Sequence, residues 1–358
     1  MSKKPLILGI ESSCDETAAS LITENEEGFP VVLSNIVSSQ VEVHREFGGV
    51  VPELAARSHI EKIDWIVKKA IDESGRKIEE IDAVASTAGP GLIVCLSVGL
   101  SFGKAFATAM NKPFIAVNHL EGHALSPKLN TNLNYPYLLL LISGGHSQYL
   151  SVQNLGKYKR LGTTIDDALG EAFDKTAKLL GIEFPGGPQI EILAKKGDPE
   201  KYDLPKPIFS KGGCNLSFAG LKTAVLKISK TIKSEQDKYD LAASFQKTIE
   251  EILYKKTKIA FTEFEKINEL NEKIFVVAGG VAANKKIRSM LINLCEENNY
   301  KSIFPPIEFC GDNAAMIAMV GLEKFKINQF NNLDYPAKPR WPLDEDAAFL
   351  KGAGVPLQ

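Results

Sequence analysis

A short apolar run, a polar turn and a second apolar run occur near the start of this sequence and again in its middle. The first copy spans residues 6–22 and turns through the acidic segment 11–17. The second spans residues 137–152 and turns through a Ser-Gly-Gly-His-Ser segment at 143–147. Short apolar runs bounded by polar turns are typical of buried β-strands. Each copy therefore predicts a β-hairpin, and the chain is predicted to contain one structural unit twice.

A third turn, at residues 278–284, is also rich in glycine. It follows an apolar run at 273–277 and precedes an amphipathic segment at 286–294. Glycines let backbone N–H groups approach a phosphate closely, and a helix N-terminus favours anions. A Ser-Gly-Gly turn is also a common plain hairpin loop. Two hairpins followed by a late glycine turn nevertheless form the layout of the actin, Hsp70 and sugar-kinase superfamily, in which two lobes clasp a nucleotide.

The length of the chain supports a division into lobes. Its 358 residues exceed the usual size of a single hydrophobic core. We expect an α/β protein with a duplicated actin-like fold around a nucleotide cleft. The predicted parts are an N-terminal lobe at 1–125, a C-terminal lobe with a helical insertion at 126–345, and a tail at 346–358.

Composition limits the class of protein. With 42 Lys and Arg against 44 Asp and Glu, the net charge is −2, so no basic excess indicates nucleic-acid binding. The five cysteines are odd in number and lack C-x-x-C spacing, which favours a reducing compartment. The longest uncharged stretch, 88–103, is rich in Gly and Ser and predicts a helix packed on a sheet. We expect a cytoplasmic protein with no membrane partner.

Two histidines lie four residues apart, at His119 and His123. This spacing places both imidazoles on one side of a helix, where they can bind a single metal ion. A zincin motif requires glutamate directly after the first histidine, and Leu120 occupies that position. The pair is therefore not the metalloprotease motif. Two histidines that line or cap a buried helical turn are the alternative.

Asp312 is the candidate third ligand, because it places a carboxylate at the start of an apolar helix. Two histidines and one carboxylate suit Fe(II) or Zn(II), and the open coordination positions imply that the ion contacts substrate. The alternative role of Asp312 is that of an N-cap, and one residue can serve both purposes.

Short motifs are spread over nearly the whole chain, at residues 9–17, 48–56, 89–92, 119–123, 143–146, 173–175, 185–188, 218–223, 279–284, 312–313 and 339–343. In combination these segments resemble the TsaD family. Departures from the family pattern are small: Gly311 stands where threonine or serine is common, and Ala219 where serine is usual.

The resemblance implies a tRNA-modifying acyltransferase. In this family a threonylcarbamoyl group moves from threonylcarbamoyl-AMP to N6 of adenosine 37, just 3′ of the anticodon, in tRNAs that read codons beginning with A, and AMP is released. The residues matching His119, His123 and Asp312 hold the metal, and we expect one divalent ion per subunit, Fe(II) ahead of Zn(II). The implied partners are tRNA, a TsaB-like subunit and a TsaE-like ATPase, with a TsaC-like enzyme making the donor.

Further site residues follow from the resemblance and from the expected cleft. The general acid or base is predicted to be one of three residues, which the sequence does not distinguish: Asp15, Glu16 and His146. The positions that match the family's ligand-binding residues are Leu141, Ile142, Ser143, Gly144, Gly145, Asp174, Gly187, Glu191 and Asn284.

Two other classes of protein fit parts of the pattern. An actin-like ATPase or small-molecule kinase would use the glycine turns to hold ATP and would need no histidine pair. A binding-only scaffold would lack activity altogether. The lysine-rich segment 222–258 predicts a solvated helix face, with an RNA-facing surface as the alternative.

Overall fold

The computed structural model describes residues 4–347, which form two compact units. The first unit consists of the chain up to Leu133 together with Pro305–Glu345. The second unit contains Asn134–Phe304. The predicted division placed 126–345 in one lobe and so differs from these units at both ends. The reason is that α10 (Ala314–Lys326) packs on strands of the first unit. Most of the predicted tail lies outside the described residues.

The first unit is built on a five-stranded sheet in the order β3-β2-β1-β4-β5. Strands β1 and β2 pair antiparallel, which confirms the first predicted hairpin, whereas β1, β4 and β5 run parallel. The strands are β1 (Ile7–Glu11), β2 (Glu16–Glu24), β3 (Pro30–Ser39), β4 (Ala83–Gly89) and β5 (Phe114–Asn118). The helices besides α10 are α1 (Val41–Arg45), α2 (Pro52–Ser74), η1 (Ile78–Glu80), α3 (Ile93–Ala109), α4 (His119–Leu125), η2 (Ser126–Leu129) and η4 (Ile307–Phe309).

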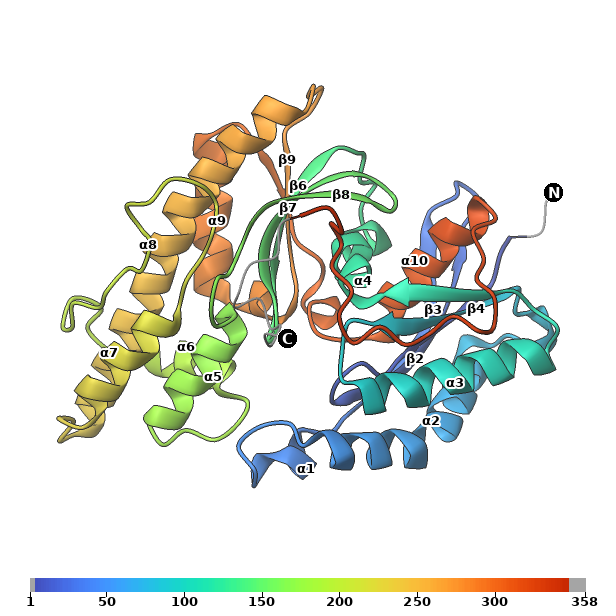
Figure 1. The fold of residues 1–358 in the computed structure, drawn as a ribbon, viewed down its shortest axis with the longest axis horizontal. Coiled ribbons are helices and arrows are strands. Elements are labelled where there is room, and N and C mark those ends of the chain that lie inside the picture. The colour runs from blue at the N-terminus through green and yellow to red at the C-terminus, as the bar shows by residue number, and fades with distance from the viewer. Residues whose placement is uncertain (1–3, 348–358) are drawn as a thin grey trace. The chain divides into compact units, whose positions relative to one another are not determined.

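Helices cover both faces of this sheet (Figure 1). Ile10 belongs to the core that contains α2 and α3 residues such as Ile66 and Leu100. The preceding residue, Gly9, points to the opposite face, where an added Cβ would lie 2.5 Å from the Ala314 carbonyl oxygen. Successive side chains of a strand alternate between faces. Glycine at position 9 therefore lets α10 pack directly against β1.

The second unit repeats this topology, with a sheet in the order β10-β9-β6-β7-β8. Strands β6 and β7 pair antiparallel, and β9 lies parallel to both β6 and β10. This confirms the second hairpin and the predicted duplication. The strands are β6 (Tyr137–Ile142), β7 (Ser147–Asn154), β8 (Lys157–Thr163), β9 (Ile274–Ala278) and β10 (Lys301–Ile303). The helices are α5 (Leu169–Leu179), α6 (Gly186–Ala194), α7 (Ala219–Ser229), α8 (Glu235–Ile267), η3 (Gly280–Ala283) and α9 (Lys285–Glu297).

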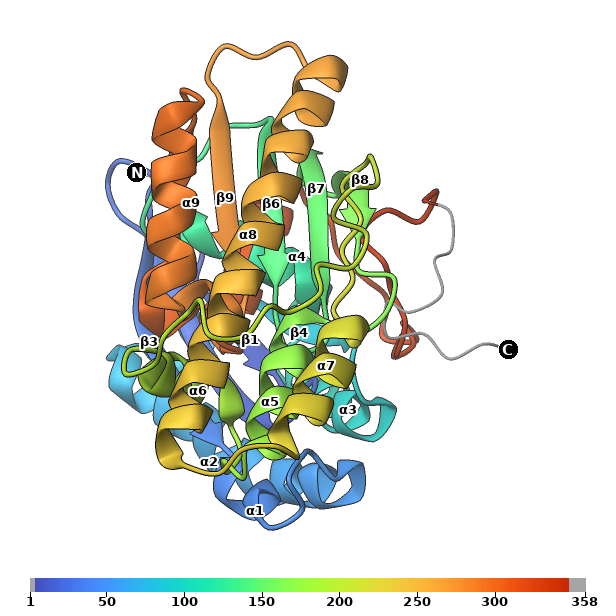
Figure 2. The ribbon, with the colours of Figure 1, turned by 90° about the vertical axis from the view of Figure 1, so that its left-hand side faces the viewer.

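Helices α5 to α8 lie between β8 and β9 in the chain and form the helical part of this unit. Figure 2 shows the long α8 running along the strands. The lysine-rich segment 222–258 is not one helix, because α7 ends at Ser229 and α8 begins at Glu235. Ser234 caps α8 by accepting a hydrogen bond from the Asp237 N–H. Among residues 4–347, no helix is long and apolar enough to cross a membrane.

Candidate metal centre

Both histidines of the predicted pair lie on the short helix α4, directly after β5. Asn118 ends the strand and caps the helix, since its Oδ1 accepts the Leu120 N–H at 2.9 Å. All seven residues of α4 are buried. The His119 and His123 rings meet edge to face with centroids 4.8 Å apart. The helix therefore presents two imidazoles to one buried point, as the spacing predicted.

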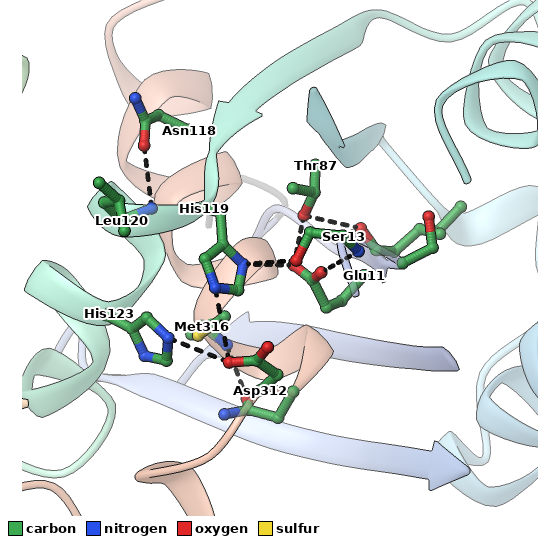
Figure 3. A network of polar contacts seen from close by, with 12 residues as sticks. Glu11, Ser13, Thr87, Asn118, His119, Leu120, His123, Asp312 and Met316 are labelled. Carbon is green, nitrogen blue, oxygen red and sulfur yellow. Dashed lines mark hydrogen bonds and ion pairs between the residues drawn. The ribbon is translucent and has the colours of Figure 1, made fainter. Parts of the chain in front are cut away.

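Asp312 reaches these histidines from the segment before α10 (Figure 3). Its Oδ1 lies 3.1 Å from His123 Nε2 and 3.5 Å from His119 Nε2. The alternative prediction, that Asp312 caps the helix, is wrong because Asn313 is the N-cap and accepts the Met316 N–H. A neighbouring residue thus performs the capping, and the Asp312 carboxylate is left to face the imidazoles.

The other side of the His119 ring contacts the end of β1. Glu11 Oε2 lies 3.1 Å from His119 Nδ1, and Ser13 Oγ lies 3.2 Å from the same nitrogen. Thr87 on β4 donates its hydroxyl hydrogen to Glu11 Oε2 at 2.5 Å. Sequence patterns alone assign no role to Glu11, unlike Asp15 and Glu16 of the same acidic segment, because its contact with His119 joins residues far apart in the chain.

Charge in this cluster is balanced between acidic and basic groups. Burial opposes ionisation of Asp312, but the charges and hydrogen bonds of His119 and His123 outweigh it and hold the pKa of Asp312 well below its usual range. Burial alone would lower the pKa of His119, but Asp312 and Glu11 raise that pKa well above its usual value. A positive charge is therefore strongly favoured at this point of the first unit.

The three side chains fit a divalent transition-metal ion. Two imidazole nitrogens and a carboxylate oxygen, all within 4.8 Å of one another, offer the donor set of two histidines and one carboxylate. Two donors that are each about 2.1 Å from one ion lie at most about 4.2 Å apart. Small side-chain movements would therefore bring all three onto one ion. The buried His123 Nδ1 has no hydrogen-bond partner among the described residues.

A buried ion pair connects α4, which carries the two histidines, with α10, which follows Asp312. Glu121 lies between the histidines on α4, and its Oε2 is 2.8 Å from Lys324 Nζ on α10. The Glu121 and Lys324 side chains are only 4% and 9% exposed. Gly122 faces the same helix, and an added Cβ would lie 3.0 Å from Ile317 Cδ1. Glu121 is therefore a brace between helices and not the general base of a protease.

The acidic turn between β1 and β2 lies close to this cluster. Burial and the charges of Asp312 and Asp15 raise the pKa of Glu16 well above its usual value. His59 on α2 holds the turn, because its Nε2 donates to the Cys14 carbonyl oxygen at 3.0 Å. Burial and the neighbouring charges thus favour the protonated form of Glu16, which suits this residue to act as an acid. The third candidate, His146, belongs to the second unit.

The predicted ligand-binding residues of the second unit gather around the end of β6. Leu141 and Ile142 are fully buried strand residues, so only their backbone could contact a ligand. The Gly170 N–H at the start of α5 donates to the Ser143 carbonyl oxygen at 3.1 Å. In the turn itself, Gly144 and Gly145 are exposed, and an added Cβ at either would meet no atom within 4 Å.

The remaining predicted ligand-binding residues hold helix ends together. Asp174 Oδ1 accepts the Gly186 and Gly187 N–H groups at 2.8 and 3.3 Å. Asn284 Oδ1 caps α9, and its Nδ2 donates to Gln246 Oε1 at 3.0 Å. Glu191 Oε1 accepts the N–H of residue 285. No local motif marks Gln246 as the partner of Asn284, because it is one amide in a lysine-rich helix.

A family model described as "TsaD: tRNA N6-adenosine threonylcarbamoyltransferase" matches residues 31–319. The chain belongs to the TsaD family. The tRNA N6-adenosine threonylcarbamoyltransferase of Pelagibacter ubique (strain HTCC1062) is 81% identical over 357 residues, which are 100% of each chain. The enzyme of that name from Rickettsia conorii (strain ATCC VR-613 / Malish 7) is 54% identical over 342 residues, which cover 95% of this chain and 98% of the relative.

A solved structure with the same fold is full-length HypF in a phosphate- and nucleotide-bound form. The TM-score is 0.58 with 13% sequence identity, covering 92% of this chain and 48% of the HypF chain. This likeness concerns the fold alone. Together with the repeated sheet, it confirms the predicted actin-like fold of this TsaD-family chain. The relatives confirm the predicted transferase class.

Proposed function

We propose that this chain transfers a threonylcarbamoyl group from threonylcarbamoyl-AMP to N6 of adenosine 37 in tRNAs that read codons beginning with A. The names of its relatives support the reaction. A metal-assisted mechanism is supported by one observation: His119, His123 and Asp312 lie together in one cluster of the first unit. These three residues would hold one divalent ion, Fe(II) ahead of Zn(II).

Transfer requires three events at the carbamoyl carbon. The adenosine amine forms a C–N bond, the bond from that carbon to the AMP phosphate oxygen breaks, and the amine loses one proton. Lewis-acid polarisation of an acyl or phosphoryl oxygen is the chemistry that a bound divalent ion would supply. A positioned acid or base would transfer the proton.

Asp15, Glu16 and His146 stay the candidates for proton transfer. Glu16 is favoured as the acid, because burial and the charges of Asp312 and Asp15 raise its pKa and so favour the protonated carboxyl. Asp15 is its neighbour on the same turn and would accept the amine proton when ionised. The His59 bond to the Cys14 carbonyl would keep this turn in place during the reaction.

The donor is proposed to bind at the turns of the second unit. The exposed Gly144 and Gly145 leave space for a phosphate to reach backbone N–H groups. Asn284 and Glu191 accept the first N–H groups of α9, and they would contact the adenosine part of the donor. The backbone of Leu141, Ile142 and Ser143, with Asp174 and Gly187, would complete this donor site.

RNA binding is proposed to depend on partners. A net charge of −2 cannot supply the long-range attraction that free tRNA binding generally needs. A TsaB-like subunit and a TsaE-like ATPase are the proposed partners. The cytoplasmic location stays a prediction.

The decisive experiment is to incubate the chain and its partners with synthesised donor and unmodified tRNA. Mass spectrometry of the digested tRNA should then show threonylcarbamoyladenosine, and His123→Ala should remove it. Magnesium-dependent ATP hydrolysis by the chain alone, unaffected by His123→Ala and without any modified nucleoside, would favour the kinase-like alternative.

A further inference from the structure

His119 differs from His123 in what its second ring nitrogen contacts. On the side of the ring away from Asp312, His119 Nδ1 lies 3.1 Å from Glu11 Oε2. The corresponding nitrogen of His123 has no partner among the described residues. Among the described residues, a carboxylate therefore contacts the second nitrogen of His119 but not that of His123.

Glu11 is itself held firmly. Only 1% of its surface is exposed, and its two oxygens have separate partners. Oε1 accepts the Ser13 N–H at 2.5 Å, and Oε2 accepts the Thr87 hydroxyl hydrogen at 2.5 Å. These bonds connect the carboxylate to the turn after β1 and to the neighbouring strand β4. The Ser13 and Thr87 bonds thus hold the carboxylate plane of Glu11 independently of His119.

The direction of the hydrogen bond decides the state of the imidazole. An ionised carboxylate can only accept, so His119 Nδ1 must donate its hydrogen to Glu11. Ser13 Oγ, 3.2 Å from the same nitrogen, can share that hydrogen as a second acceptor. In a neutral imidazole with hydrogen on Nδ1, the lone pair is on Nε2. His119 Nε2 is the atom that faces Asp312 at 3.5 Å.

We propose that Glu11 is a positioning residue, which fixes the ring orientation and tautomer of His119 so that Nε2 is presented to the metal. The inference rests on the proposed metal site and not on the identity of the transferred group. Carboxylates commonly perform this task for metal-bound histidines, and their loss lowers metal affinity by roughly 10–100-fold. Figure 3 shows Glu11, His119 and Asp312 in this order across the site.

A purely structural role for Glu11 makes a different prediction. If Glu11 only secured the turn after β1, removing its charge would lower stability without changing the metal site. Glu323 offers a matched control, because this carboxylate on α10 is also largely buried and pairs with Lys128 at 2.7 Å. It belongs to the same unit but has no contact with either histidine in the structure.

The experiment compares wild type, Glu11→Gln and Glu323→Gln as purified full-length chains without tRNA or donor. Affinities for Zn²⁺ and Co²⁺ are measured by competition with a chelator, and the visible spectrum of the Co²⁺ form reports ligand geometry. We expect Glu11→Gln to weaken both affinities by roughly 10–100-fold and to change the Co²⁺ spectrum. Glu323→Gln should keep the wild-type affinity and spectrum. Thermal unfolding of all three proteins measures the stability effect separately.

Wild-type affinity and spectrum in Glu11→Gln would overturn the proposal, even if that variant were less stable. Should Glu11→Gln fail to fold, Thr87→Val keeps the carboxylate but removes one of its hydrogen bonds, and it should weaken metal binding by a smaller factor. Unchanged affinity in Thr87→Val would then overturn the proposal. A wild type that binds metal but makes no threonylcarbamoyladenosine would contradict the proposed function and leave the role of Glu11 standing.

Discussion

The two units share one sheet topology but differ in the turn that follows the first strand. In the first unit β1 ends at the buried Glu11, which is 1% exposed, and the acidic turn that follows is partly buried. In the second unit the turn after β6 is Ser-Gly-Gly, with Gly144 and Gly145 exposed. The same scaffold therefore carries a charged cluster suited to metal chemistry in one copy and an open backbone surface suited to ligand binding in the other.

The largest expected effect tests the charged cluster. His123→Ala should lose bound metal and reduce transferase activity to background while the fold survives, because a catalytic ion is not usually the main support of a fold. Metal content by mass spectrometry, circular dichroism and the tRNA modification assay measure the three quantities. Full activity of this variant with no metal present would show that the first unit's cluster does not perform the chemistry.

The next effect concerns the brace between α4 and α10. Glu121→Gln should lower the free energy of unfolding by about 3–5 kcal/mol, because it removes the charged partner of the buried Lys324 ammonium. Replacing both partners, as Glu121→Gln with Lys324→Met, should recover part of this loss. Denaturant titration measures both. If the double variant were no more stable than the single one, the ion pair would not be the main connection between these helices.

A pair of glycine substitutions separates binding from folding in the second unit. Gly279 has φ +94°, and an added Cβ would lie 2.5 Å from the Ile142 carbonyl oxygen, so Gly279→Ala should cost about 1–3 kcal/mol of stability. Gly145→Ala meets no atom within 4 Å and should leave stability unchanged. It should nevertheless weaken donor binding about tenfold, or about 1.4 kcal/mol. Calorimetry with a donor analogue measures this affinity. If Gly145→Ala bound the analogue as tightly as wild type, the exposed turn of the second unit would not be a ligand-binding surface.

Asn284→Ala should have a smaller effect on stability. It removes the α9 cap, which is worth about 1 kcal/mol, and it should weaken donor binding more than tRNA binding. Both affinities are measured on the assembled complex. Ser234→Ala is the matched control, since it removes the cap of α8 away from the glycine turns. Equal loss of donor and tRNA affinity would place Asn284 outside the donor site.

The smallest expected effect is a pH dependence of stability that arises at His59, which contacts the acidic turn of the first unit. Burial lowers the pKa of His59, although the Cys14 carbonyl and nearby carboxylates partly oppose this. As pH falls below about 6.5, the unfolded chain gains a proton at this histidine that the folded chain resists, so stability falls. The slope for one proton is at most about 1.4 kcal/mol per pH unit.

Denaturant titrations from pH 7.5 to 5.5 should therefore show a shallower pH dependence for His59→Gln than for wild type. His146→Gln is the control, because His146 lies in the partly exposed turn of the second unit. An equal change of slope in both variants would remove the contrast between a buried and an open turn.

Local sequence patterns determined much of this protein. Both hairpins, the glycine turn before α9 and the pairing of His119 with His123 on one helix follow from the periods of strand and helix, which neighbouring residues set. The resemblance to the TsaD family rested on short motifs and is confirmed by the family model. Asp312 was a candidate ligand on its residue type and its place at a helix start.

Tertiary structure alone decided the contacts between distant segments. Asp312 meets His123 across 189 residues of chain, and Glu11 meets His119 across 108. No local period specifies such a meeting. It depends on the absence of a side chain at Gly9, which lets α10 pack against β1. The same packing places residues 305–345 in the first unit. The choice of Asn313 over Asp312 as helix cap was also settled in three dimensions, because either side chain could have accepted the free N–H groups.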